Sequence, residues 1–159
     1  MIFDMKTMQK TISFFVYSML AMVCLFTACS DDDDDSVRIV QYALPEKMQL
    51  DVADVQPVIV KSEAEFNALF GAYAAQLTKV DFTKYDLVYG QGASDYGVVS
   101  FESWIDGDTP PYRLVVHIEQ NYTHEYVRWA VAYLLPKNDN NQVTMAVSVE
   151  MAEGTASNE

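Results

Sequence analysis

The chain has 159 residues, of which 50% are hydrophobic, so it is long enough for a domain with a sizeable core. Its 23 acidic residues outnumber its 10 lysines and arginines, which gives a formal net charge of −13. Nucleic acids and anionic lipid surfaces repel such a charge, so the composition argues against both as partners.

An apolar segment near the N-terminus is typical of an export signal. Lys6 and Lys10 precede residues 11–28, which carry no charge and end in small side chains. This order predicts a signal peptide over residues 1–28 and makes Cys29 the lipidated first residue of the processed chain. Two or three acyl chains, palmitate among them, would anchor it durably. A single transmembrane anchor is the alternative, because the apolar segment is about long enough to span a bilayer.

Five consecutive aspartates, Asp31–Asp35, follow the cysteine. Because like charges keep such a run extended, we predict an acidic tether over residues 29–36. A cysteine and serine followed by acids resemble the export signal of Bacteroidota-type surface lipoproteins. The resemblance implies a lipid anchor in the outer membrane with the domain facing the cell surface, the periplasmic face being the alternative. Ser36 stands in an Asp-Ser-Val sequence that resembles an O-glycosylation acceptor of that group.

The rest of the chain is predicted to form one domain over residues 37–151, followed by a flexible tail over residues 152–159. Strands are expected where apolar and β-branched residues recur between turn-forming residues. The expected strands cover residues 37–42, 57–61, 87–91, 98–104, 113–120, 129–135 and 143–149.

One helix is expected between the second and third of these strands. Ser62-Glu63-Ala64-Glu65 fits a capping box, in which Ser62 and Glu65 satisfy each other's free backbone N–H groups. Apolar residues then recur at helical spacing up to about Gln76. They are Phe66, Leu69, Phe70, Tyr73 and Leu77.

The predicted strands after the helix alternate apolar and polar residues. Leu114, Val116 and Ile118 are interleaved with polar side chains. Such alternation indicates one buried and one solvated face. We therefore predict an α+β fold, a curved antiparallel sheet of about five to seven strands with one main helix packed on one face.

The sequence predicts no catalytic residue, cofactor site or metal site. His117, Glu119, His124 and Glu125 are metal-ligand types, but they lack a metal-binding motif and are interpreted as solvated, an enzyme or zinc protein centred on His117, Glu119 and His124 being the alternative. Gly90-Gln91-Gly92 lacks the helix that a phosphate-binding loop requires, so a tight bend or bulge is expected there. We therefore expect a protein that is not an enzyme.

Aromatic residues provide the remaining functional signal. Exposed tyrosines bind proteins or stack on sugars, whereas buried ones belong to the core. The tyrosines predicted to form a binding patch are Tyr96, Tyr112, Tyr122 and Tyr126. The expected partner is an unknown protein or, alternatively, a glycan bound by exposed Tyr and Trp.

Two segments resemble the C-terminal domain of PrcB-type protease-complex proteins. Residues 58–70 (VIVKSEAEFNALF) resemble its strand-then-helix entry, and residues 80–88 (VDFTKYDLV) resemble the passage into its next strand. Residues 94–97 (SDYG) depart from the Gly-Gly-Tyr stretch of that family. The resemblance implies a noncatalytic role in modulating an extracellular protease or another envelope protein.

Overall fold

The computed structural model describes residues 37–152. The predicted signal peptide, Cys29, the aspartate run, Ser36 and the tail from residue 153 lie outside the described residues. The predictions made for them therefore stay predictions.

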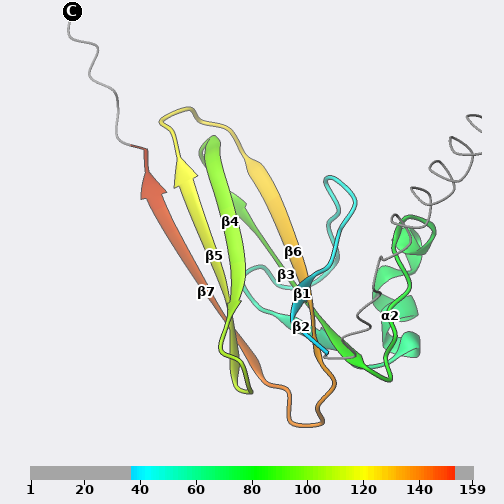
Figure 1. The fold of residues 1–159 in the computed structure, drawn as a ribbon. Coiled ribbons are helices and arrows are strands. Elements are labelled where there is room, and N and C mark those ends of the chain that lie inside the picture. The colour runs from blue at the N-terminus through cyan, green and yellow to red at the C-terminus, as the bar shows by residue number, and fades with distance from the viewer. Residues whose placement is uncertain (1–36, 153–159) are drawn as a thin grey trace, which may run out of the picture. The chain divides into compact units, whose positions relative to one another are not determined.

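The described residues are mostly strand with one short helix, so the broad α+β class is confirmed (Figure 1). Helix α2 spans Glu63–Phe70 and continues as a 3₁₀ helix over Gly71–Gln76. The strands are β1 (Val40–Gln41), β2 (Val58–Val60), β3 (Tyr85–Ser94), β4 (Val98–Asp106), β5 (Tyr112–Gln120), β6 (Val127–Pro136) and β7 (Val143–Met151).

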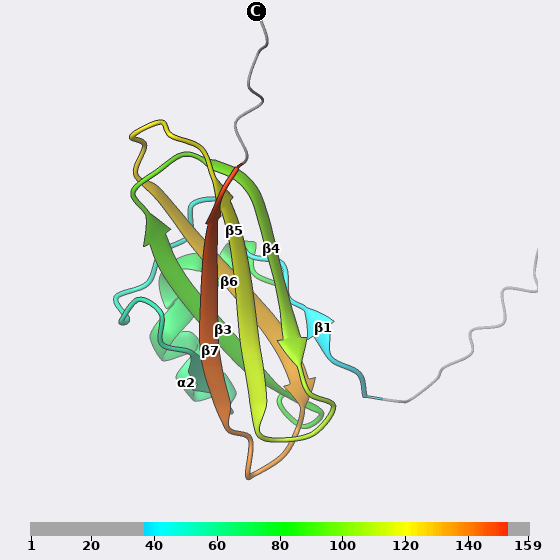
Figure 2. The ribbon, with the colours of Figure 1, turned by 90° about the vertical axis from the view of Figure 1, so that its left-hand side faces the viewer.

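The described strands form two sheets, whereas the sequence predicted one. The larger sheet has the order β1-β6-β3-β2, and the smaller sheet has the order β4-β5-β7. Neighbouring strands are antiparallel except β5 and β7, which run parallel. They are parallel because β6, which separates them in the chain, runs back through the larger sheet. Figure 2 shows the smaller sheet in front, with the larger sheet and α2 behind it.

Two apolar layers hold these parts together. The layer between the sheets contains Leu114, Val116 and Ile118, as the alternation predicted, with Val131 and Leu135 of the larger sheet. The layer between the larger sheet and α2 is built from buried residues of both and of the connection between β1 and β2, namely Tyr42, Met48, Val60, Phe66, Phe70, Leu87, Tyr89 and Ala132. The larger sheet is therefore buried on both faces.

The structure confirms the predicted start of the helix, with Ser62 as the capping residue. The Ser62 hydroxyl accepts a hydrogen bond from the Glu65 N–H at 3.3 Å. The Glu65 carboxylate accepts from the Lys61 N–H at 2.7 Å, one residue earlier than in the predicted capping box. The first bond satisfies a backbone donor that the first helical turn leaves free, and the second satisfies the N–H of the residue before the cap.

The bend predicted at Gly90-Gln91-Gly92 is wrong. These residues lie inside β3, which pairs with β6 in unbroken register from Tyr85 to Ser94. A Cβ on Gly92 would lie 2.3 Å from the Trp129 ring, and one on Gly90 would lie 2.9 Å from Leu114. The glycines allow close packing rather than a turn.

Candidate functional site: the tyrosine loop

The two most exposed aromatic side chains lie on the segment that joins β5 to β6. This segment, residues 121–126, is called the tyrosine loop below. Tyr122 is 72% exposed and Tyr126 is 63% exposed. The loop lies at the end of the two sheets where β3 also turns into β4 (Figure 1).

Backbone hydrogen bonds fix the tyrosine loop to the β3–β4 turn. The Gly97 N–H donates to the Thr123 carbonyl at 3.0 Å, and the Asn121 N–H donates to the Gly97 carbonyl at 2.9 Å. The Thr123 N–H also donates to the Asn121 side-chain oxygen at 2.9 Å. A Cβ on Gly97 would lie 2.4 Å from the Thr123 hydroxyl, so a larger residue would require the Thr123 and Asn121 side chains to shift. The loop is therefore held in one shape before any partner binds.

A contact between two rings and a buried hydroxyl stabilise the end of the domain that carries the tyrosine loop. The rings of Tyr96 and His124 lie 5.2 Å apart, and Tyr96 is half-buried. Beneath them, the buried Ser94 hydroxyl donates to the Tyr96 carbonyl at 2.6 Å and accepts from the Gln120 side-chain amide. Tyr96, Tyr122 and Tyr126 thus belong to one end of the domain.

The inclusion of Tyr112 in the predicted patch is wrong. Tyr112 is the first residue of β5 and is 3% exposed, whereas the tyrosine loop follows the last residue of that strand. Nine strand residues separate the two positions by about 30 Å. Burial, with a smaller effect from Asp108, raises the pKa of the Tyr112 phenol. Its side chain therefore belongs to the core.

Further apolar side chains are exposed near the tyrosine loop. Val99 follows Val98, which pairs with the last residue of β5. Met151 at the end of β7 pairs with that same β5 residue, Gln120. This end of the domain thus combines exposed tyrosines with exposed aliphatic groups, a composition found in protein interfaces.

The metal-ligand types lie on two different surfaces. His117 and Glu119 are on the outer face of the smaller sheet, where they contact the hydroxyls of Ser148 (2.9 Å) and Ser100 (3.1 Å) respectively. His124 is in the tyrosine loop, and its ring is tilted by 33° against the Tyr96 ring. Within residues 37–152, no three His, Cys, Asp or Glu side chains are grouped so that they could hold a metal ion.

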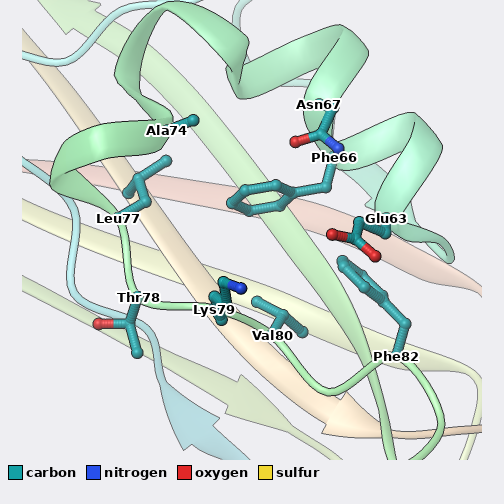
Figure 3. Close-up of a pocket in the computed structure, with 9 residues that line it drawn as sticks. All are labelled: Glu63, Phe66, Asn67, Ala74, Leu77, Thr78, Lys79, Val80 and Phe82. Atoms are coloured by element: carbon teal, nitrogen blue, oxygen red, sulfur yellow. The ribbon is translucent and has the colours of Figure 1, made fainter.

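A small cavity next to α2 was not predicted from the sequence. Figure 3 shows Phe66 and Phe82 directed into the space between α2 and the segment 77–82. Their ring centroids are 6.0 Å apart, and the cavity volume is about 280 Å³. Glu63 and Lys79 also line it. Ligand pockets usually enclose about 300–1,000 Å³, so this cavity is a weaker candidate than the tyrosine loop.

Comparisons with protein families, with curated proteins and with solved structures found no match for this chain. The resemblance to PrcB-type proteins therefore stays a prediction. Among the helices of the described residues, none is both long and apolar enough to cross a membrane.

Proposed function

We propose that the protein is a noncatalytic binding or regulatory module that presents the tyrosine loop to a protein partner outside the cytoplasm. The observation that carries this proposal is the exposure of Tyr122 and Tyr126 on a loop that hydrogen bonds hold in place. The module is anchored in the outer membrane through acylated Cys29 and faces the cell surface. Its partner is an extracellular protease or another envelope protein. We also keep, as part of this proposal, the prediction that the sheet is curved.

Physical arguments favour tyrosine as the contact residue. Tyrosine provides a large amphipathic surface and loses little side-chain entropy on binding, so it is common among residues that dominate binding energy. A loop that is already ordered avoids the cost of ordering it in the complex. Truncating one such anchor typically weakens binding by about 2 kcal/mol or more.

Binding of a glycan is the second candidate. Aromatic faces stack on sugar rings, and nearby polar groups provide hydrogen bonds. The tyrosine loop offers both, because Thr123 and Glu125 are exposed between its two tyrosines. The protein candidate is preferred because an exposed aliphatic residue, Val99, lies at the same end, and aliphatic groups bind proteins better than sugars.

The proposed contact is tested by replacing the exposed rings. Full-length chain carrying Tyr122→Ser and Tyr126→Ser is compared with wild type in capturing partners from the native cell envelope. A matched control is Trp104→Ser, which removes an exposed aromatic from β4 rather than from the tyrosine loop. We expect wild type and the control to recover the same protein and the double variant to lose at least tenfold. Recovery of polysaccharide with no protein would favour the glycan candidate, and equal recovery by all three chains would contradict both.

The proposed anchor has its own test. Producing cells are labelled with a palmitate analogue, and labelling of wild type, Cys29→Ser and Cys24→Ser is compared. We expect Cys29→Ser to abolish the label and Cys24→Ser to retain it, because only Cys29 follows the predicted cleavage site. Cleavage of the domain by protease added to intact cells tests surface exposure. If the acidic residues direct export to the cell surface, we expect this cleavage to be lost when Asp31–Asp35 are replaced by asparagine.

A further inference from the structure

The described sheets have four edge strands, and they differ in how well they resist pairing with another chain. β1 and β2 contain two and three residues, and β4 contains a register shift between Val98 and Ser100. β7 has nine residues in unbroken register with β5 and contains neither proline, glycine nor lysine. Short, bulged or lysine-bearing edges prevent strand addition, and β7 has none of these features. It is therefore the edge most suited to accept another strand.

Two hydrogen bonds show which backbone N–H and C=O groups of β7 face away from β5. The Gln142 carbonyl accepts from Tyr112 at one end of the strand, and the Ala152 N–H donates to Gln120 at the other. Hydrogen-bonding direction alternates along a strand, so even-numbered residues face β5 and odd-numbered residues face outward. The outward N–H and C=O groups therefore belong to Val143, Met145, Val147, Val149 and Met151. Within the described residues, no strand pairs with this side of β7.

The side chains of the same five residues face the larger sheet. Val143, Met145 and Val147 pack against the core between the sheets. Val149 and Met151 stay 52% and 38% exposed. The unused edge is thus flanked by incompletely buried apolar side chains, which favours an added strand that brings apolar residues to the same face.

We propose that this edge binds a second copy of the chain, with the two β7 strands antiparallel about a twofold axis through Val147. The two three-stranded sheets then form one continuous sheet. In this register Val147 faces its own counterpart, Met145 faces Val149, and Val143 faces Met151. Every outward N–H and C=O group of the five residues gains a partner. Val149 and Met151 are covered by apolar side chains of the second copy.

The charges on the outer face fit the same register. Glu150 lies beside Glu119 at one end of β7, and Thr144 lies beside Arg113 at the other. Antiparallel pairing places Thr144 of the second copy opposite Glu150. Arg113 of the second copy is then two strands from Glu150, about 10 Å between Cα atoms, within reach of both long side chains. Arg113 also pairs with Asp106 of its own copy, so each copy brings a cation that it already shares with one carboxylate near the other copy's Glu150.

Cysteine pairing tests this register in the full chain. Thr144 and Glu150 of the two copies would form a non-hydrogen-bonded pair with Cα atoms about 4.5 Å apart, a separation that permits a disulfide. Thr144→Cys chains and Glu150→Cys chains are produced together and separately, with different tags. We expect a reducible mixed dimer only when both are present, because like positions lie about 20 Å apart in this register. The wild-type chain is the control for any disulfide that the native cysteines form.

A charge at the edge tests the same contact without relying on cysteine chemistry. Val149→Lys is placed in both cysteine chains, and Val40→Lys, at a similarly exposed valine of β1, is the matched control. We expect the first to reduce the mixed dimer at least tenfold and the second to leave it unchanged. The proposal is overturned if the mixed dimer is absent, if both lysines reduce it equally, or if the cysteines instead capture a different protein.

Discussion

Gly92 determines how closely β3 approaches the Trp129 ring. A Cβ there would lie 2.3 Å from that ring, and Trp129 is itself packed in the core between the sheets. We expect Gly92→Ala to lower the free energy of unfolding by about 1–3 kcal/mol, because the buried Trp129 indole must shift. Gly71→Ala is the matched control, since its Cβ would meet nothing within 4 Å and its φ of −52° suits alanine. Denaturant unfolding measures both, and equal losses would contradict the packing argument.

Asp86 is a fully buried carboxylate that connects two segments of the chain. It accepts hydrogen bonds from the Lys137 ammonium at 2.7 Å and from the Asn141 amide at 2.8 Å. Removing one partner of a buried pair typically costs about 3–5 kcal/mol, so we expect Asp86→Ala to lower stability by about that amount. Asp106→Ala breaks the exposed pair with Arg113 and should cost under about 1 kcal/mol. Comparable losses in thermal unfolding of the two variants would show that burial does not matter here.

The tyrosines show what residue-level reasoning can predict. Tyr112 was placed in the exposed patch, yet it is in phase with Leu114, Val116 and Ile118, so extending the alternation by one step predicts its burial. Tyr122 and Tyr126 lie in a loop, where alternation does not apply, and their exposure was a hypothesis that the structure supports. The contact between Gly92 and Trp129 was not predictable, because the two residues are 37 positions apart and meet only through strand pairing.

At the scale of elements, the start of α2 depends on one side chain. The Ser62 hydroxyl satisfies the Glu65 N–H, and loss of such a cap typically costs about 1 kcal/mol. We expect Ser62→Ala to lower the free energy of unfolding by about that amount, and Ser62→Asp to retain stability. Denaturant unfolding distinguishes them. Equal free energies of unfolding for Ser62→Asp and Ser62→Ala would contradict the role given to the Ser62 cap.

The positions of the long strands could be predicted from the sequence, but which strands pair with one another could not. Alternation indicates which side chains are buried, and it placed β4 to β7 within a few residues of their bounds. It does not say which strands pair, so the division into two sheets and the parallel pairing of β5 with β7 were missed. Uninterrupted apolar runs, Leu87 to Tyr89 in β3 and Trp129 to Leu135 in β6, were the available signal in the sequence. Such runs indicate strands covered on both faces.

At the scale of the whole molecule, the described domain contains no cysteine and depends on its two apolar layers. The Tyr89 phenol connects these layers to the segment before β2. Its hydroxyl donates to the Gln91 side chain at 2.8 Å, and that side chain hydrogen-bonds Leu50, Val52 and Asp54. Ionising Tyr89 would remove the donor and place a charge among apolar groups, so folding should be sensitive to alkaline pH.

Burial raises the pKa of Tyr89 to about 12 from its ordinary value of 10.0. Because the folded-state pKa is the higher one, the neutral phenol stabilises the fold fully below pH 10, and this stability is lost as pH rises from 10 towards 12. A shift of about two units corresponds to on the order of 2–3 kcal/mol. We expect Tyr89→Phe to be less stable than wild type at pH 8 by about 1 kcal/mol, yet to lose less stability between pH 10 and 12. Tyr122→Phe, at an exposed position, should follow wild type throughout. Parallel pH profiles for wild type and Tyr89→Phe in denaturant unfolding would show that another group causes the alkaline loss.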